Sequence, residues 1–406
     1  MKVQIFCPFG QDTGYGRAAH DYCEAMLSAG IDLDIRPIID PKLDKLENRY
    51  QNLLDYVNRP EADDPAWPDV VIMHATPPGC EKLLEEFVGR DSVPRVALTT
   101  WESDPLPEHL AKRISGYDQI WVPSKYCYAV VTRQPNDEWL THNFDRSTND
   151  VVKVMPHSFD PNFFVYKDYA PYRERKDAKK CYVFYTILTF CERKNPIGLL
   201  KAYLTEFGPE DNVLLRIRTP GYNNDDINEL VRGLGLKYLP PVEMLCDYLD
   251  EAGLLSLHYN SDCYVTCARS EGWGLGAYES AVLGKPVIYT NYSGLKDFLD
   301  DTHGCIPIPY FETPAYTPES VSNTEINIAG VRIKPILRND HTGINGSQTW
   351  AEPDLGTLKK QMRNVYEVNL TEGNEAREDL ESRYSYTAVG KLIKDTLGEL
   401  LSRTGV

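Results

Sequence analysis

The sequence Ser270-Glu271-Gly272-Trp273-Gly274-Leu275-Gly276-Ala277-Tyr278-Glu279 is the most informative stretch of this 406-residue chain. It follows an apolar run at 263–268, which predicts a buried strand, and it leads into a predicted helix at 278–283. Its three glycines allow a tight turn that brings backbone N–H groups close to a ligand. Because the N-terminus of a helix favours negative charge, the stretch predicts a phosphate-binding loop.

Two carboxylates flank this loop. Glu271 stands before the glycines and Glu279 follows eight residues later, inside the predicted helix. Carboxylate oxygens accept hydrogen bonds from vicinal hydroxyls, so the pair suits a sugar and a ribose on either side of a diphosphate. The spacing alone is equally consistent with one Glu that caps the helix and a second on a solvated face.

Strand-like and helix-like segments alternate on both sides of this stretch. Apolar runs predict strands at 3–7, 31–39, 69–73, 96–100, 119–122, 183–190, 212–217, 263–268 and 286–290. Helical periodicity predicts helices at 17–29, 125–132, 196–207, 242–252, 278–283, 355–366 and 388–401. Short strands separated by helices predict parallel sheets covered by helices on both faces, with ligands at the carboxyl ends of the strands.

Two segments interrupt the alternation. Residues 157–180 contain prolines, several tyrosines and a basic cluster at 173–180, and they predict an interdomain linker. Residues 303–350 are rich in Pro, Thr, Asn and Gly and predict a long loop. The length and this pattern together predict two α/β domains of similar size.

The charge and the cysteines exclude several classes of protein. The chain carries 43 Lys and Arg against 60 Asp and Glu, a formal net charge of −17 spread along its length. This excludes a generally basic protein that binds nucleic acid or anionic membranes, although not a small local basic patch. We find neither an apolar run long enough for a transmembrane helix nor a signal peptide. Ten cysteines without metal-ligand spacing predict reduced thiols and a cytoplasmic protein.

Several short motifs add a resemblance to a known family. The stretch 270–279 resembles the Glu-x7-Glu signature of family 4 glycosyltransferases, which are retaining enzymes with the GT-B fold. Further motifs resemble the family's and occur in its order: Val122-Pro123-Ser124, Pro156-His157-Ser158-Phe159-Asp160, Arg193-Lys194-Asn195, Gly284-Lys285-Pro286-Val287-Ile288, Tyr292-Ser293-Gly294-Leu295 and Ala351-Glu352-Pro353-Asp354. Each motif is weak alone, whereas their ordered sequence across nearly the whole chain is specific.

The resemblance implies an α/β architecture of the GT-B type, in which two Rossmann-like parallel-sheet domains face each other across a cleft. Residues 1–165 would form the N-terminal, acceptor-side domain. Residues 166–380 would form the nucleotide-sugar-binding domain, and 381–406 a C-terminal helix that returns to the N-terminal domain.

The resemblance also implies roles for individual residues. Glu271 would contact hydroxyls of the donor sugar, Glu279 would contact the donor ribose, and Lys194 with Arg193 would neutralise the diphosphate. The remaining donor-binding residues would be the phosphate-cradling amides of Gly274, Leu275 and Gly276, the sugar-loop residues Ser293 and Gly294, and the glycine-rich loop Gly14-Tyr15-Gly16-Arg17.

Two positions depart from the family pattern. Leu188 and Thr189 stand where many members carry an arginine, so Arg193 would replace that charge or Lys194 and helix dipoles would act alone. Trp101-Glu102-Ser103 stands where many members carry a histidine. Glu102 could position the acceptor or assist proton removal and Trp101 could stack on a ring; alternatively, Trp101 is a core residue and Glu102 caps a helix. His74, at the end of a predicted strand, is either another polar group on the acceptor side or a turn residue.

The expected function is therefore a metal-independent, retaining hexosyl or pentosyl transfer with no cofactor. The donor would be a nucleoside diphosphate sugar, most commonly a UDP-sugar, and the acceptor a hydroxyl on a glycan, a glycoconjugate or a small molecule. The alternatives are transfer to a hydroxymethylated base in viral DNA, which the acidic charge disfavours, a nucleotide-sugar epimerase, a glycan phosphorylase, and a degenerate nucleotide-sugar-binding module.

Overall fold

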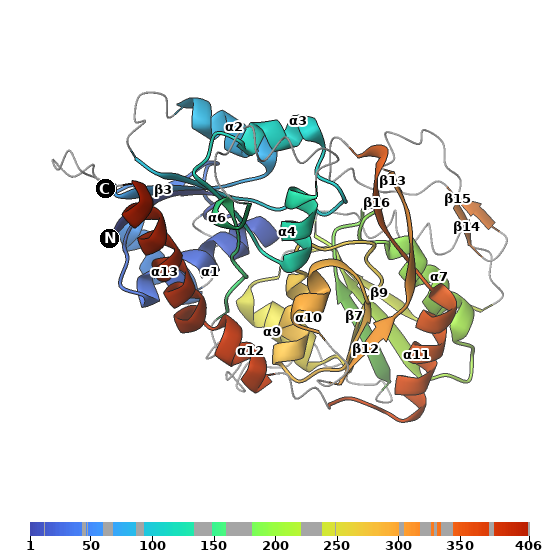
Figure 1. Ribbon diagram of the computed structural model, residues 1–406. Helices are drawn as coiled ribbons and strands as arrows, with labels where there is room; N and C mark the ends of the chain where they lie inside the picture. The colour runs from blue at the N-terminus through green and yellow to red at the C-terminus, as the bar shows by residue number, and fades with distance from the viewer. Residues whose placement is uncertain are drawn as a thin grey trace. The chain divides into compact units, whose positions relative to one another are not determined.

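The chain forms two compact units, residues Met1–Val165 with Asp379–Val406, and residues Tyr166–Glu378. The computed structural model describes residues 1–11, 13–42, 46, 48–59, 68–86, 93–133, 148–159, 181–220, 238–247, 249–299, 304–316, 326–328, 331–333, 344–372 and 377–404 (Figure 1). Most of the predicted linker at 157–180, with its basic cluster at 173–180, lies outside the described residues.

The first unit is built on a six-stranded sheet of order β2-β1-β3-β4-β5-β6. All five strand pairs are parallel. The strands are β1 (Lys2–Cys7), β2 (Asp32–Pro37), β3 (Val70–His74), β4 (Arg95–Leu98), β5 (Gln119–Val122) and β6 (Val152–Val154). Every residue of β3 and β5 is buried, as expected for strands covered on both faces.

Helices connect these strands. They are α1 (Gly14–Ser28), η2 (Asn48–Tyr56), α2 (Pro77–Glu86), α3 (Glu108–Ala111), η3 (Lys112–Ile114), α4 (Lys125–Thr132) and α6 (Thr148–Val151). Ser124 caps α4 as predicted, because its hydroxyl accepts a hydrogen bond from the Cys127 N–H at 3.1 Å.

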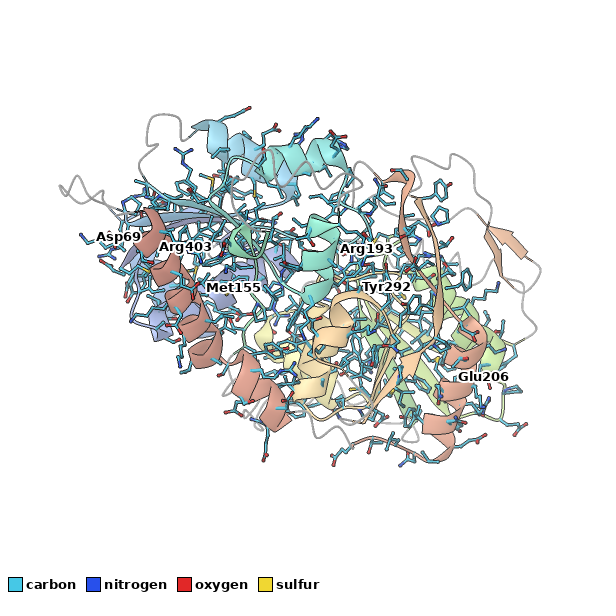
Figure 2. The ribbon with its side chains drawn as sticks, in the orientation of Figure 1. Asp69, Met155, Arg193, Glu206, Tyr292 and Arg403 are labelled. Atoms are coloured by element: carbon cyan, nitrogen blue, oxygen red, sulfur yellow. The ribbon has the colours of Figure 1, made fainter. Side chains whose placement is uncertain are left out.

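The end of the chain adds α12 (Arg377–Tyr384) and α13 (Tyr386–Thr404), and α13 packs on α1 (Figure 1). Val389 and Ile393 of α13 belong to the same buried cluster as Ala25 of α1. An ion pair of 2.7 Å between Arg403 Nη1 and Asp150 Oδ1 joins α13 to α6 (Figure 2). The C-terminal helix is therefore part of the first unit.

The second unit also contains a six-stranded sheet, in the order β12-β11-β10-β7-β8-β9. Its five strand pairs are again parallel. The strands are β7 (Tyr182–Ile187), β8 (Val213–Arg218), β9 (Val242–Leu245), β10 (Cys263–Thr266), β11 (Val287–Thr290) and β12 (Cys305–Ile308). The predicted α/β class with two Rossmann-like parallel sheets is thus confirmed.

The second unit carries α7 (Pro196–Glu206), α9 (Glu251–Tyr259), α10 (Leu275–Val282), η5 (Ser293–Asp297) and α11 (Leu355–Glu367). Its first strand in the chain, β7, lies between β8 and β10, so the strand order changes direction there. In open α/β sheets, ligands bind at the carboxyl ends of the strands at such a switch point. The ends of β7 and β10 therefore mark the expected site.

The predicted helix at 242–252 is wrong. Residues Val242–Leu245 form the edge strand β9, which pairs with β8 through Leu215↔Val242 to Arg218↔Leu245. The next helix, α9, begins only after Asp250, whose carboxylate caps it by accepting the Gly253 N–H at 2.8 Å. The apolar residues before Asp250 fit the period of a helix and that of a strand, and pairing with β8 at the edge of the sheet makes 242–245 a strand.

The long loop predicted at 303–350 is also wrong in part. After β12, β13 (Tyr310–Tyr316) pairs with β16 (Asn345–Pro353) in antiparallel fashion, and the short strands β14 (Ile326–Ile328) and β15 (Val331–Ile333) form a hairpin. The partners in β13 and β16 lie far apart in the sequence, so local composition does not reveal the pairing.

All ten cysteines are free thiols. Among the described residues, no helix combines the length and the apolar character needed to cross a membrane.

The close packing of α13 on α1 gives a test of the fold. A Cβ atom at Gly390 would lie 2.1 Å from the carbonyl oxygen of Ala25, whereas at Gly398 of the same helix it would have no heavy atom within 4 Å. Gly390→Ala should lower the free energy of unfolding by about 1–3 kcal/mol, since the helices must separate. Gly398→Ala should raise it by about 0.5–1 kcal/mol, because Ala loses less backbone entropy. Denaturant unfolding measures the free energy of unfolding of both variants. The same change in this free energy for Gly390→Ala and Gly398→Ala would contradict the described packing.

Candidate functional site

The segments that follow β7 and β10 lie against each other at the carboxyl edge of the second sheet. The Arg269 N–H donates to the Arg193 carbonyl at 2.7 Å. The Asn195 amide donates to the Cys267 carbonyl at 3.2 Å, and the Cys267 thiol contacts the Asn195 carbonyl at 3.3 Å. These bonds bring residues 193–195 beside 267–271, although more than 70 positions separate them in the sequence.

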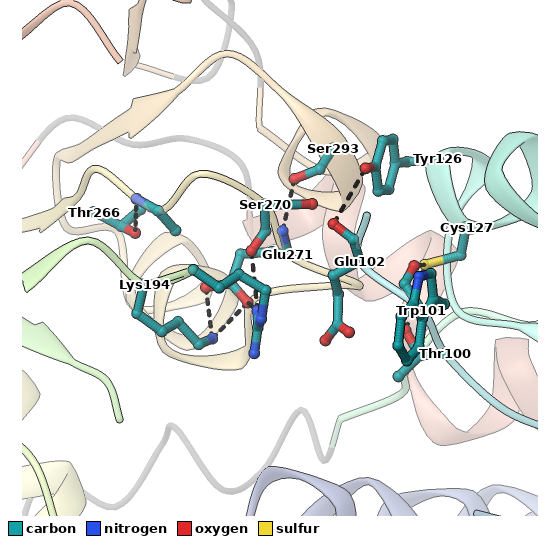
Figure 3. A network of polar contacts seen from close by, with 12 residues as sticks. Thr100, Trp101, Glu102, Tyr126, Cys127, Lys194, Thr266, Ser270, Glu271 and Ser293 are labelled. Atoms are coloured by element: carbon teal, nitrogen blue, oxygen red, sulfur yellow. Dashed lines mark hydrogen bonds and ion pairs between the residues drawn. The ribbon is translucent and has the colours of Figure 1, made fainter. Parts of the chain in front are cut away.

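The carboxylate of Glu271 is the centre of this site. Lys194 Nζ donates to both of its oxygens, at 2.6 Å and 2.5 Å, and Arg193 Nη1 lies 3.2 Å from Oε2 (Figure 3). The side chains of Glu271 and Arg193 are each 9% exposed and that of Lys194 is 20% exposed. Partial burial strengthens these charge-assisted hydrogen bonds relative to a pair in water. The site therefore combines two cations with one carboxylate at short range.

The backbone around Glu271 is fixed from the other side. The Glu271 N–H donates to the hydroxyl of Ser293 at 2.8 Å, and the Gly294 N–H donates to the Glu271 carbonyl at 3.0 Å. Ser293 adopts a left-handed conformation with φ of +61°. The predicted sugar-loop residues Ser293 and Gly294 thus lie directly on the segment that carries Glu271.

The N-terminus of α10 follows immediately. Asn195 and Asp250 cap α7 and α9 with side-chain oxygens, whereas no side chain caps α10 at Gly274. Gly274 has a φ of +102°, a conformation that other residues rarely adopt. The first N–H groups of α10, at Leu275 and Gly276, are thus where an anion would be bound by a helix terminus.

Glu279 lies one turn further along α10 and is 6% exposed. Its Oε2 is 3.3 Å from His258 Nε2, in the last turn of α9. The other ring nitrogen of His258 lies 2.9 Å from the hydroxyl of Tyr185, which lies 2.9 Å from the hydroxyl of Ser280. Sequence reasoning missed His258 and this network. No short-range signal could have found it, since Tyr185 and Glu279 belong to different elements.

Arg269 is a second residue that sequence reasoning missed. Its Nε pairs with Glu352 at 2.6 Å, and its Nη1 pairs with Glu192 at 2.8 Å. The Ala351 N–H also donates to the Arg269 carbonyl at 3.0 Å. Arg269 therefore joins β16 and the segment after β7 to the segment that carries Glu271. The motif Ala351-Glu352-Pro353-Asp354 gave a partial signal, because Glu352 is the partner and Asp354 caps α11.

In the first unit, the buried His74 and the half-buried His157 lie at the carboxyl edge of the sheet. His74 ends β3, and its ring lies 5.4 Å from that of Tyr15 and 5.8 Å from that of Tyr22. The Tyr22 ring also lies 5.3 Å from that of His157. Burial, with a smaller contribution from His157, lowers the pKa of His74 to about 3, and burial lowers the pKa of His157 to about 3. Both rings are therefore neutral near pH 7; sequence reasoning had named His74 as a candidate site residue and His157 only as part of a motif.

Trp101 and Glu102 follow β4 in the first unit. Both are buried, at 4% and 7% exposed. Side chains of α4 contact their backbone carbonyls. The Tyr126 hydroxyl donates to the Glu102 carbonyl at 3.3 Å, and the Cys127 thiol contacts the Trp101 carbonyl at 3.5 Å (Figure 3). The next helix, α3, has Pro107 at its N-cap, so Glu102 does not cap it.

The predicted glycine-rich loop Gly14-Tyr15-Gly16-Arg17 is not a loop in the structure. These residues form the first turn of α1, which begins at Gly14 rather than at residue 17. Thr13 is the reason, because its hydroxyl accepts the Gly16 N–H at 3.1 Å and caps the helix three residues early. Any contact with a donor would therefore come from a helix terminus.

The structure thus brings together part of the predicted site. Within the second unit, Arg193, Lys194, Glu271, Ser293 and Gly294 form one connected cluster, and Gly274 to Glu279 continue from it along α10. Within the part of the chain that is described, no group of three or more His, Cys, Asp or Glu side chains could hold a metal ion.

Comparisons with known proteins agree with this location. Residues 244–310, which include Glu271, Glu279, Ser293 and Gly294, match the family model described as glycosyl transferases group 1. A search of curated proteins gave no significant match to the whole sequence.

Solved structures show the same fold over the whole chain. The Anabaena protein HepE in complex with UDP and glucose aligns with a TM-score of 0.62 at 12% identity, over 98% of this chain and 99% of that one. Sucrose-phosphate synthase from Thermosynechococcus elongatus gives 0.61 at 13% identity, over 99% of both chains. A glycosyltransferase from Rickettsia africae gives 0.59 at 12% identity, over 98% of both. The chain therefore has the GT-B fold that the motifs predicted.

The lowered pKa of His74 gives a prediction for the first unit. Between pH 6.5 and about 3, the unfolded chain binds a proton at His74 that the folded chain does not bind. The free energy of unfolding should thus decrease as the pH is lowered through this window, by up to about 1.4 kcal/mol per pH unit for each such histidine. His74→Gln should make this pH dependence shallower in denaturant unfolding, and His109→Gln, at an exposed histidine, should leave it unchanged. Identical pH dependence in His74→Gln and wild type would contradict the neutral, buried state of His74.

Proposed function

We propose that this protein is a retaining, family 4 glycosyltransferase that moves a sugar from a nucleoside diphosphate sugar to an acceptor hydroxyl. The observation that carries the proposal is the Glu271 carboxylate, held by Lys194 and Arg193 beside the N-terminus of α10. Cations and free helix amides suit a diphosphate, and a carboxylate suits sugar hydroxyls. The match of residues 244–310 to glycosyl transferases group 1 supports the same conclusion.

A UDP-sugar is the donor that we propose. The printed descriptions of the HepE structures name UDP, glucose and UDP-glucose as bound molecules, which supports this choice by analogy of fold. Glu279 would accept hydrogen bonds from the donor ribose, and the amides of Leu275 and Gly276 would contact the phosphates.

Donor binding requires an exchange of partners at Lys194. Without a ligand, Lys194 Nζ contacts both oxygens of Glu271. A diphosphate carries more negative charge than one carboxylate, so it attracts Lys194 more strongly. Its arrival would release the Glu271 carboxylate to accept hydrogen bonds from the donor sugar. Arg193 would remain as the second cation, in place of the arginine missing at 188–189.

The proposed reaction then needs no protein nucleophile. The bond between C1 of the sugar and the diphosphate oxygen breaks, and a bond from C1 to the acceptor oxygen forms on the same face. The acceptor proton passes to the departing diphosphate. Lys194, Arg193 and the α10 amides would stabilise the charge that develops on this leaving group.

Further parts of the proposal come from the sequence and from the resemblance. His74, Trp101 and Glu102 would contact the acceptor, the transfer would be independent of metal ions and cofactors, and the protein would be cytoplasmic. The acceptor hydroxyl would belong to a glycan, a glycoconjugate or a small molecule.

Isosteric substitutions of the central ion pair test the proposal. Glu271→Gln and Lys194→Met should each lower the rate of transfer by about two or more orders of magnitude, because each removes a charge that acts on the donor. Mass spectrometry of candidate acceptors incubated with UDP-glucose measures the transfer.

Lys359→Met is the matched control. Lys359 lies on α11 and pairs with Glu206 at 3.7 Å, so this variant also removes a lysine of the second unit, but outside the site. It should retain full activity. Full activity of Glu271→Gln and Lys194→Met together would refute the site assignment.

A further inference from the structure

We propose that His258 is a positioning residue that fixes the carboxylate of Glu279 for recognition of the donor ribose. This inference rests on the proposed function, since it concerns how the proposed donor is recognised. It adds a residue outside all the motifs that led to that function.

The geometry places His258 at the centre of a buried network. His258 is 1% exposed, and Glu279, Tyr185 and Ser280 are all buried as well. His258 Nε2 lies 3.3 Å from Glu279 Oε2, and Nδ1 lies 2.9 Å from the Tyr185 hydroxyl. The network thus joins α9, β7 and α10.

The hydroxyl protons limit the hydrogen bonds of the network. Ser280 has a single hydroxyl proton, and it is used on the Gly276 carbonyl at 2.6 Å. The single Tyr185 proton is donated either to Ser280 Oγ or to His258 Nδ1, each at 2.9 Å, and these two atoms lie 3.3 Å apart. Burial raises the pKa of Tyr185 well above its ordinary value, so this proton is always present.

His258 Nδ1 therefore accepts a hydrogen bond from Tyr185 in one arrangement and donates to it in the other. In either case the 3.3 Å contact between Nε2 and Glu279 joins the imidazole to the carboxyl group by a hydrogen bond.

This arrangement has a direct consequence for ligand binding. A carboxylate on a flexible Glu side chain can rotate, and hydrogen bonding from a buried ring removes that freedom before the ligand arrives. The chain that fixes Glu279 ends at the carbonyl of Gly276, in the first turn of α10, where we place the phosphates. The network therefore aligns the ribose-recognising carboxylate with the phosphate-binding helix terminus.

The test compares nucleotides that differ only in the ribose hydroxyls. Isothermal titration calorimetry with UDP, 2′-deoxy-UDP and 3′-deoxy-UDP needs no acceptor and no turnover. The wild-type protein should bind UDP at least about 10-fold more tightly than one of the deoxy forms. A site that hydrogen-bonds a hydroxyl binds an analogue without that hydroxyl more weakly.

Three variants then assign the preference to the network. His258→Leu should reduce the preference for UDP over the deoxy form to about 2-fold or less, and Tyr185→Phe should also reduce this preference. His258→Gln, which restores an N–H donor, should recover most of the preference.

Tyr203→Phe is the matched control, because Tyr203 is an equally buried tyrosine of the second unit whose hydroxyl donates to the Pro241 carbonyl at 2.8 Å. It should keep the full preference.

The outcomes separate the two proposals. Absence of UDP binding by the wild type would overturn the proposed UDP-sugar donor. Binding of UDP with an unchanged preference in both His258→Leu and Tyr185→Phe would overturn only the role of His258. Tyr185→Phe keeps the packing of the ring and removes one oxygen, so the second outcome can be measured even if His258→Leu does not fold.

Discussion

The pairing of Glu271 with Lys194 and Arg193 is the interaction on which the second unit's site depends. A chain with a net charge of −17 can attract an anionic donor only where cations are concentrated, and here two lie within 3.2 Å of one carboxylate. Removal of Glu271 would leave two largely buried cations without their carboxylate partner, and we propose that an anion enters the cluster by exchange of partners at Lys194. Arg269 supports this arrangement, because it joins β16 and the segment after β7 to the segment that carries Glu271.

Much of the fold could be predicted because its signals are local. Runs such as 119–122 and 287–290 are apolar and bounded by Pro, Ser or Asn, and Ser124 marks the start of a helix with its own side chain. Predictions failed where long-range pairing decides the structure. Residues 242–245 fit a helical period as well as a strand, and only pairing with β8 makes them a strand. In the same way, β13 finds its partner 29 residues after its own end, beyond the reach of any turn signal.

The site, like the fold, has parts that local sequence predicts and parts that only long-range contacts create. The glycines and the two glutamates stand close together in the sequence, so the loop and the start of α10 could be anticipated. The contact of Lys194 with Glu271 could not be derived from spacing, since 77 positions separate them. The resemblance implied only that both residues act at the donor. The contact of His258 with Glu279 had no signal in the sequence, and the contact of Arg269 with Glu352 had only the partial signal of the motif at 351–354, because three-dimensional packing creates both contacts. The helical start at Gly14 was missed although Thr13 is a recognisable cap.

The partner exchange at Lys194 is the central claim, and a crystal structure of the protein with bound UDP tests it most directly. The account predicts that Lys194 Nζ lies about 3 Å from a diphosphate oxygen, at ordinary hydrogen-bond distance. It also predicts that Nζ no longer contacts both oxygens of Glu271. A bound diphosphate remote from Lys194, with the ion pair between Lys194 and Glu271 intact, would contradict the account.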